Sequence, residues 1–165
     1  MSKKRERFII GSGFIAARFK KYHKFLKKKK IIIYAAGISN SLEVNKKNLE
    51  REVLKIKNFI HNNKKKLIYI STCSVNDESR RRKLYVKNKI KIEKIIKQES
   101  KEYMIIRLPE IIGKNKNPNT LTNFFYNKIV KGESFTVFKS SRRNLLDIDD
   151  AIKNCIKIIR SYRKN

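Results

Sequence analysis

Residues 8–16 read Phe-Ile-Ile-Gly-Ser-Gly-Phe-Ile-Ala, which is the pattern of an apolar strand, a glycine turn and the start of a helix. In a Gly-x-Gly-x-x-Ala turn, the first glycine allows the sharp bend and the second lets the backbone approach a pyrophosphate. The small third residue lets the helix pack closely on the strand, so Gly11, Gly13 and Ala16 suit these three tasks. This stretch therefore predicts a nucleotide-binding turn near the beginning of an α/β domain.

The rest of the chain alternates short apolar runs with helical patterns. Residues 31–36 and 67–70 are continuous apolar runs, as in strands that are buried on both faces of a sheet. Apolar residues recur every three or four positions from Leu49 to Ile60, which indicates a helix between these strands. We expect a reduced Rossmann-like α/β fold, in which a doubly wound, mainly parallel sheet carries helices on both faces.

One domain is expected to span residues 1–165, because this length suits a single core and no repeat or linker interrupts it. A minimal substrate-binding part is expected at about 109–148. There the pattern predicts a loop at 114–119, a helix at 121–130 and a short strand at 135–138.

The chain is strongly basic, with 43 Lys and Arg against 14 Asp and Glu and a net charge of +29. Such a charge suggests nucleic acid or another anionic surface as a partner. However, Lys, Ile and Asn fill 72 of the 165 positions, and all three have AT-rich codons. We favour composition bias together with a phosphate-bearing substrate, and an anionic macromolecule or membrane surface is the alternative.

The sequence carries no sign of membrane insertion or secretion. No apolar run reaches the roughly 18 residues that a membrane-spanning helix needs, and the basic N-terminus lacks the apolar stretch of a signal peptide. Cys73 and Cys155 are too few for a disulfide framework, which favours a cytoplasmic protein with free thiols. His23 and His61 lack metal-ligand spacing, so no metal site is expected.

A second candidate site combines a hydroxyl at a strand end with a Tyr-x-x-x-Lys pair. Thr72 lies at the carboxyl end of the predicted strand, two positions after the apolar run 67–70, and Tyr85 and Lys89 follow on a predicted helix. Residues four apart share a helix face, so the Lys89 ammonium can lower the phenol pKa of Tyr85 from about 10. Tyr85 can then move a proton near neutral pH, while Thr72 bonds the same substrate oxygen. The alternative is two exposed residues on a lysine-rich helix.

Together these motifs resemble the extended short-chain dehydrogenase/reductases, the NAD-dependent epimerase/dehydratase family that acts on nucleotide sugars. The resemblance runs from about Phe8 to Ile159 and includes residues 33–37, 106–113 and 142–150. The catalytic residues that it implies are Thr72, Tyr85 and Lys89, and the substrate-binding residues are Asn123 and Arg143. The cofactor-binding residues that it implies are Gly11, Gly13, Phe14, Ile15, Ala35, Ala36, Gly37 and Lys89.

The resemblance implies an enzyme, an NAD- or NADP-dependent oxidoreductase or epimerase that transfers a hydride at a carbon of a nucleotide-activated sugar. Surface polysaccharide synthesis is the expected context. The expected partner is a nucleotide-sugar substrate, no nucleic-acid partner is expected, and the assignment allows a homodimer. Two alternatives stay open: a catalytically degenerate member that only binds nucleotide, and a basic nucleic-acid-binding module.

One part of the family pattern is absent from the sequence. Dinucleotide sites place an acidic residue about 20 positions after the glycine turn, where it holds the ribose hydroxyls. Here no Asp or Glu lies between Glu6 and Glu43, and the chain passes through residues 27–30, all lysine, directly into the next strand. A strand–helix–strand piece is therefore expected to be missing. The four lysines either meet the 2′-phosphate of NADP or form a solvated helix end, and we favour the solvated end.

Overall fold

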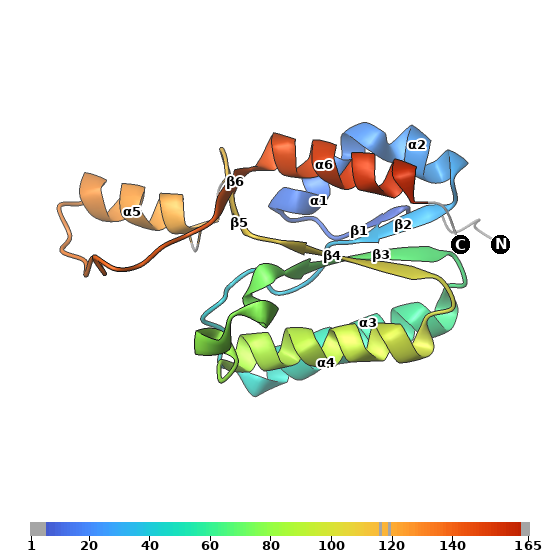
Figure 1. The fold of residues 1–165 in the computed structure, drawn as a ribbon, viewed down its shortest axis with the longest axis horizontal. Helices are drawn as coiled ribbons and strands as arrows, with labels where there is room; N and C mark the ends of the chain where they lie inside the picture. Colours follow the sequence, from blue (N-terminus) through green and yellow to red (C-terminus); the bar gives the residue numbers. More distant parts are fainter. Residues whose placement is uncertain (1–5, 116, 119, 163–165) are drawn as a thin grey trace. The chain divides into compact units, whose positions relative to one another are not determined.

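The computed structural model describes residues 6–115, 117–118 and 120–162, and the chain forms two compact units (Figure 1). Unit 1 comprises Met1–Arg107, and unit 2 comprises Leu108–Asn165. The boundary falls next to the predicted start of the substrate-binding part at about 109. That one domain spans both units stays a prediction.

The sheet of unit 1 has four strands in the order β1-β2-β3-β4, and the pairs β1–β2 and β2–β3 are parallel. Ile9 lies opposite Ile33, and Ile32 lies opposite Leu67. All of β2 and the middle of β3 are buried, because helices cover both faces of this sheet. The elements of unit 1 are β1 (Ile9–Ile10), α1 (Phe14–Phe19), η1 (Lys20–Tyr22), α2 (His23–Lys28), β2 (Ile31–Tyr34), α3 (Lys46–Asn62), β3 (Lys66–Thr72), η2 (Cys73–Asn76), η3 (Glu78–Arg80), α4 (Leu84–Glu99) and β4 (Tyr103–Leu108).

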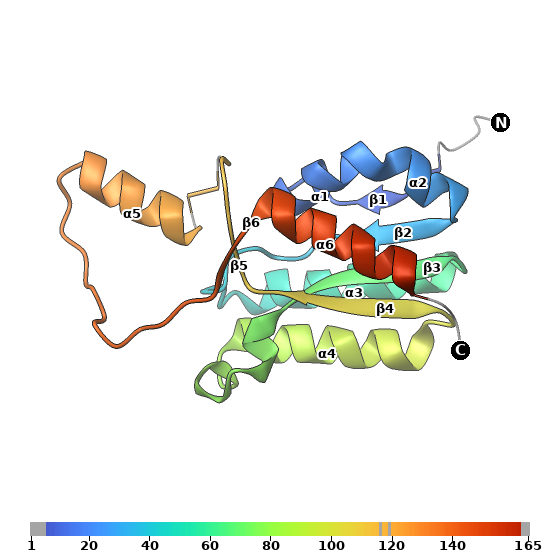
Figure 2. The same ribbon diagram turned by 45° about the horizontal axis from the view of Figure 1, so that its top comes forward.

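Helices α1 and α2 cover one face of this sheet, and α3 and α4 cover the other (Figures 1 and 2). The arrangement confirms the predicted reduced Rossmann-like α/β fold. Helix α3 begins at Asn45, whose side-chain oxygen accepts hydrogen bonds from the N–H groups of Lys47 and Asn48 at 3.0 and 3.3 Å. Of the helices in the described part of the chain, none is long and apolar enough to cross a membrane.

Strand β1 lies at the edge of the described sheet and pairs directly with β2. In the common doubly wound order 3-2-1-4-5-6, the first strand instead lies inside the sheet, flanked by the second and the fourth. The direct step from β1 to β2 therefore agrees with the predicted loss of a strand–helix–strand piece, which removes the strands that would lie beyond β1.

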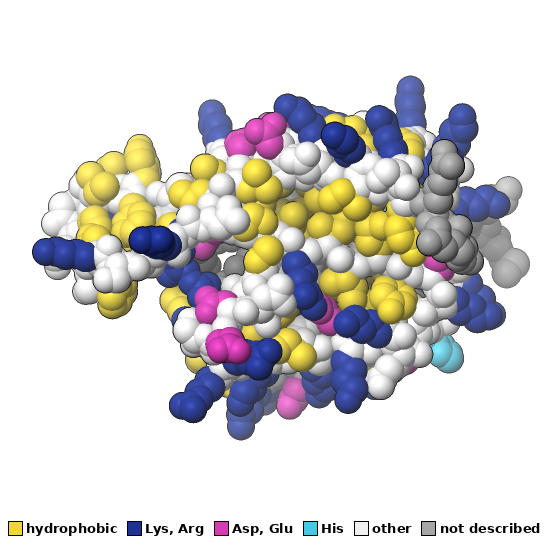
Figure 3. All heavy atoms as spheres, viewed as in Figure 1, with side chains coloured by type: hydrophobic (Ala, Val, Ile, Leu, Met, Phe, Trp, Pro, Cys, Tyr) yellow, Lys and Arg dark blue, Asp and Glu magenta, His cyan; other side chains and the backbone are white. Residues whose placement is uncertain are grey.

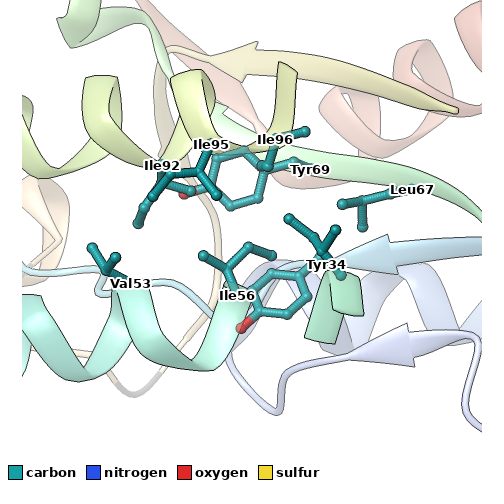
Figure 4. Packing of buried hydrophobic residues seen from close by; sticks show 9 residues of the cluster. Tyr34, Val53, Ile56, Leu67, Tyr69, Ile92, Ile95 and Ile96 are labelled. Atoms are coloured by element: carbon teal, nitrogen blue, oxygen red, sulfur yellow. The ribbon is translucent and has the colours of Figure 1, made fainter. Parts of the chain in front are cut away.

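A hydrophobic core fills the space between the sheet and the α3–α4 layer (Figure 4). The Tyr34 ring lies edge-on to Phe59 with ring centroids 5.2 Å apart, and 6.2 Å from the centroid of Tyr69. The Tyr69 hydroxyl is buried and has no hydrogen-bond partner among the described residues. The buried residues of this cluster are Tyr34, Val53, Ile56, Ile60, Leu67, Tyr69, Ile92, Ile95 and Ile96.

Unit 2 contains a two-stranded parallel sheet and two helices. Helix α5 has the predicted bounds, whereas the chain on either side of it is largely irregular. Helix α6 begins after Asp147, whose carboxylate accepts hydrogen bonds from the N–H groups of Asp149 and Asp150 at 2.8 and 3.3 Å. The elements of unit 2 are β5 (Glu110–Ile112), α5 (Leu121–Val130), β6 (Leu145–Asp147) and α6 (Ile148–Ser161).

The predicted strand at 135–138 is wrong. The structure shows no strand there, and Phe138 is 74% exposed. The Phe135 ring packs instead on Phe125 of α5, with ring centroids 5.2 Å apart, so its aromatic surface contributes to ring packing and not to a ladder. The partner of β5 is β6, which begins ten residues after the start of the wrongly predicted strand. The predicted loop at 114–119 includes residues 116 and 119, which lie outside the described residues.

Candidate active site

The glycine turn joins β1 to α1, and its two glycines have different surroundings. Gly11 has φ +126°, and a Cβ atom there would lie 2.5 Å from the carbonyl oxygen of Ala35. A side chain at Gly11 is therefore excluded, because it would strain the backbone at this positive φ and would overlap the carbonyl of Ala35. Gly13 immediately precedes α1, and a Cβ atom there would meet nothing within 4 Å. The open space beside Gly13 fits the close approach of a pyrophosphate that the sequence predicts.

The rest of the turn also agrees with the predicted roles. Ala16 is fully buried, so the third small residue does allow close packing of helix and strand. Phe14 and Ile15 form the half-buried start of α1. The backbone N–H of Ala35 donates a hydrogen bond to Ile10 at 2.8 Å, which fixes the strand end after β2 beside the turn. Two segments that the sequence predicts to bind the cofactor are thus brought together.

The strand end after β2 also meets the predicted catalytic lysine. A Cβ atom at Gly37 would lie 2.5 Å from Nζ of Lys89 and 2.7 Å from Oε1 of Glu52. The missing side chain of Gly37 therefore leaves the room that these two charged groups occupy. Ala35, Ala36 and Gly37 hence lie between the glycine turn on one side and Lys89 on the other, where the resemblance places a cofactor.

Tyr85 and Lys89 lie one turn apart on α4, and both are buried, with exposed fractions of 8% and 3%. The ammonium of Lys89 lies 5.3 Å from the centroid of the Tyr85 ring. The alternative of two exposed residues on a lysine-rich helix is therefore wrong. Lys89 and the Tyr85 ring therefore lie against each other on one face of α4, as the Tyr-x-x-x-Lys spacing predicts.

Thr72 ends β3, and its hydroxyl oxygen accepts a hydrogen bond from the N–H of Ser74 at 3.2 Å. This bond caps the short helix η2, which packs on the beginning of α4. Val75 of η2 lies in one apolar cluster with Tyr85 and Val86. The structure thus connects the strand end of Thr72 to the helix start that carries Tyr85. A catalytic role for Thr72 stays a prediction.

Two buried carboxylates belong to this region, and the sequence analysis did not identify either. Oε1 of Glu52 accepts a hydrogen bond from Lys89 at 2.6 Å, and Oε2 accepts one from Asn88 at 3.0 Å. Glu52 lies between Leu49 and Val53 at helical spacing, and this position in an apolar stripe was the available signal.

The second carboxylate is Glu93, which receives two hydrogen bonds from Arg107 at 3.1 and 2.6 Å and one from Ser71 at 2.6 Å. Burial opposes the ionisation of Glu93, but the hydrogen bonds from Arg107 and Ser71 outweigh it and lower the pKa of Glu93. Arg107 also donates to Asn76 at 3.0 Å, so this cluster joins α4, β3, β4 and η2.

The predicted substrate residues belong to unit 2. The side-chain amide of Asn123 donates hydrogen bonds to Oδ1 and the carbonyl of Asn115 and to the carbonyl of Asn117, at 2.8–3.2 Å. It therefore holds the chain before α5, whatever it does toward a substrate. Arg143 is exposed just before β6. Substrate contacts of both residues stay predictions.

On the face that Figure 3 shows, the basic side chains do not mark out one site. Lys and Arg side chains lie scattered along the rim and within the outline of that face, and they do not gather over one element. Lys27, Lys28, Lys29 and Lys30 are all exposed, as the favoured interpretation of a solvated helix end expects. This distribution adds no support to the nucleic-acid alternative, which also expects a clustered basic face.

Comparison with known families identifies the family of this chain. The family model described as NAD dependent epimerase/dehydratase family matches residues 15–165. The chain belongs to this family. The NAD dependence of the epimerase/dehydratase family agrees with the prediction that the segments meeting around Gly11, Ala35 and Lys89 bind a cofactor. Among curated proteins, no sequence matches this chain.

Two solved structures show the same fold. The capsular polysaccharide assembling protein CapF from Staphylococcus aureus is similar with a TM-score of 0.61 and 18% identity, over 97% of this chain and 50% of that one. A UDP-glucuronic acid 4-epimerase from Bacillus cereus, solved with UDP-glucuronic acid and NAD, has a TM-score of 0.56 and 18% identity, over 86% of this chain and 52% of that one. This chain thus spans about half the length of both structures.

Proposed function

We propose that this chain binds NAD or NADP and catalyses hydride transfer at a carbon of a nucleotide-activated sugar, as an epimerase, dehydratase or reductase of surface polysaccharide synthesis. The observation that carries the proposal is the position of the Lys89 ammonium, which lies 5.3 Å from the centre of the Tyr85 ring and against Gly37. A charged lysine, a phenol and a cofactor-lining strand end are the groups that this chemistry needs together.

The residues of unit 1 fit the cofactor in two places. The open backbone at Gly13 suits the pyrophosphate, and the segment 35–37 with Lys89 suits the nicotinamide ribose. The cofactor, when bound, accepts and returns the hydride. The adenosine end is expected to be held loosely, because β1 is the edge strand and no acidic residue lies between β1 and β2.

The residues of the chain supply proton transfer and orientation. Tyr85 would take the proton of the sugar hydroxyl as the carbon is oxidised, and would return it in the reverse direction. Lys89 would stabilise the phenolate by its charge, and Thr72 would hydrogen-bond the same sugar oxygen. We assign the diphosphate to Arg143, since a guanidinium binds phosphate oxygens in pairs, and a sugar contact to Asn123.

The similar structures support this substrate class. One of them assembles capsular polysaccharide and the other is an epimerase of UDP-glucuronic acid, by their own descriptions. A nucleotide-binding relative without catalysis is the second candidate, because the side chain of Lys89 is only 3% exposed and its ammonium is paired with Glu52. Catalysis requires that the Tyr85 phenol reach a sugar hydroxyl in spite of this burial.

Calorimetric titration with NADH and NADPH tests the cofactor site. Wild type is expected to bind, and Gly13→Ala is expected to bind at least about tenfold more weakly, equivalent to roughly 1.4 kcal/mol. The new methyl group meets no protein atom within 4 Å, so the fold should be unchanged and the loss should be local. Ala17→Ser, which adds one atom to an exposed residue of α1, serves as the matched control. Equal affinities of wild type and Gly13→Ala would contradict the assigned pyrophosphate position.

Turnover tests the catalytic site. With UDP-glucose and UDP-glucuronic acid as probes and product detection by NMR, Tyr85→Phe is expected to lower turnover by about 10²–10⁴-fold, because it removes the proton carrier but keeps the ring. Unchanged turnover would exclude Tyr85 from the mechanism. Dinucleotide binding without conversion of any nucleotide sugar would favour the non-catalytic relative.

A further inference from the structure

Glu52 is a buried carboxylate that the proposed chemistry leaves without a task. It projects from α3, is 5% exposed, and has both oxygens occupied by donors from α4. Lys89 occupies Oε1 and Asn88 occupies Oε2, while Gly37 closes the third side. A buried charge costs free energy unless it is paired, so this position for a glutamate in an otherwise apolar stripe needs a reason.

We infer that Glu52 is a positioning residue of the proposed site, whose carboxylate holds the Lys89 ammonium beside the Tyr85 ring and sets the pH at which the Tyr85 phenol loses its proton. The inference rests on the proposed function only in giving Tyr85 and Lys89 their catalytic roles. The contacts themselves are 2.6 Å from Glu52 to Lys89 and 5.3 Å from Lys89 to the ring centroid.

The two charges act on the phenol in opposite directions. An ammonium favours the phenolate, whereas a carboxylate disfavours it, and a charge within about 4–6 Å of a titrating group shifts its pKa by roughly one to three units. The carboxylate of Glu52 lies 2.6 Å from the ammonium of Lys89, which lies 5.3 Å from the centroid of the Tyr85 ring. A lysine without Glu52 would favour the phenolate more strongly. The carboxylate of Glu52 therefore disfavours the ionisation of Tyr85 and also holds Lys89 in place.

The charge of Glu52 also affects the pKa values of two other tyrosines in this core. Burial and the charge of Glu52 raise the pKa of Tyr34 to about 12. Burial raises the pKa of Tyr69 well above its ordinary value, and the charges of Glu52 and of ionised Tyr85 add to it. Tyr69 of β3 links these groups, because Glu52 from α3, Tyr85 and Glu93 from α4 and Tyr34 from β2 all act on it, and Lys89 lies 5.3 Å from the centroid of the Tyr85 ring.

NMR titration of the full chain with isotope-labelled tyrosine tests the inference directly. Tyr85→Phe identifies the signal of Tyr85 among the seven tyrosines. In Glu52→Gln, the titration midpoint of Tyr85 is expected to fall by about one unit, because the carboxylate charge is removed while the shape is kept. Glu50→Gln is the matched control, since Glu50 is an exposed residue of the same helix and should leave the midpoint unchanged.

An unchanged or raised midpoint in folded Glu52→Gln would overturn the inference and leave Glu52 a purely structural residue. If this variant does not fold, Glu52→Asp serves instead, because it keeps the charge but withdraws it by one methylene. It is expected to lower the midpoint by about half a unit, and an unchanged midpoint would overturn the inference equally.

The titration uses neither dinucleotide nor sugar, so it is independent of the proposed function. A lowered midpoint in a chain that binds no NADH or NADPH would keep the influence of Glu52 on Tyr85 and remove the proposed enzyme. Dinucleotide binding with an unchanged midpoint would keep the proposed cofactor site and remove the influence of Glu52 on Tyr85.

Discussion

The two buried carboxylates of unit 1 are paired with cations in different ways. Glu52 receives one hydrogen bond from Lys89, and both side chains are closed off, with 4% and 3% of their surface exposed. Glu93 receives two hydrogen bonds from the guanidinium of Arg107, which is 35% exposed. The Glu52–Lys89 pair is thus closed off from solvent (the sealed pair), whereas the Glu93–Arg107 pair is partly exposed (the open pair).

The difference suits two different tasks. A guanidinium keeps its proton under all ordinary conditions and binds a carboxylate as a rigid fork, so the Arg107 pair fastens β4 to α4. The Lys89 pair lies beside the Tyr85 ring and against Gly37, which is predicted to line the cofactor. Two pairs of the same formal charge thus differ in burial, and we assign to the Arg107 pair the joining of elements and to the Lys89 pair the proposed tuning of Tyr85.

The largest expected effect comes from removing the cation of the sealed pair. Lys89→Met leaves the Glu52 carboxylate buried without its partner, which should lower the free energy of unfolding by about 3–5 kcal/mol. The double variant Lys89→Met with Glu52→Gln should recover most of this loss, because no charge is then left alone. Urea unfolding measures both. A double variant no more stable than Lys89→Met would show that the charge of Glu52 is not the cause.

The open pair should appear in the pH dependence of stability. The folded pKa of Glu93 lies below its ordinary value of 4.5, so its contribution is fully present above that value and is lost as the pH falls through the folded pKa. Arg107→Met should lower the free energy of unfolding by about 1.5–3 kcal/mol at neutral pH. It should also make the fall of this free energy toward acid pH (the acid limb) less steep. Urea unfolding between neutral pH and about pH 3 measures it.

Lys57→Met, which breaks an exposed ion pair to Glu99, is the control for the acid limb. It should change the free energy of unfolding by less than about 1 kcal/mol at any pH, since such pairs contribute little. An acid limb in Arg107→Met as steep as that of wild type would contradict the assignment to Glu93.

The smallest effect is expected from a methyl group inserted beside the Glu52–Lys89 pair. Gly37→Ala places a methyl group within contact of both Nζ of Lys89 and Oε1 of Glu52. The cost should be about 1 kcal/mol, at the low end for overpacking, because the ends of flexible side chains can give way. Gly13→Ala, whose methyl group meets open space, is the control in the same unfolding measurement. Equal stability of the two variants would mean that the pair adapts without cost.

The fold of unit 1 and its motif residues were predictable because their signals are local. A continuous apolar run marks β2, and spacing along α4 alone brings Tyr85 and Lys89 onto one face. Glu52 was not assigned, because its partner is 37 residues away and meets it only through the packing of α3 on α4. The stripe position indicates burial but names no partner.

Unit 2 was harder to predict for a related reason. Strands β5 and β6 have three residues each, which is too short for a periodic pattern, and they pair across more than thirty residues. The β-favouring residues at 135–138 predict a strand, but Phe135 makes ring contacts with α5 instead. Only α5, with ten residues bounded by polar loops, kept its predicted limits.

The edge position of β1 has a consequence for how the chain assembles. The four strands of unit 1 lie side by side in the order in which they occur along the chain. Each strand therefore pairs with the next strand along the chain, after one crossover connection. In an order that begins 3-2-1-4, the first strand also needs the fourth strand as a partner, which lies much further along the chain. Loop-closure entropy and the search for distant contacts are both smaller for neighbouring strands. A shortened sheet of this order can grow by one strand at a time, from the first to the last.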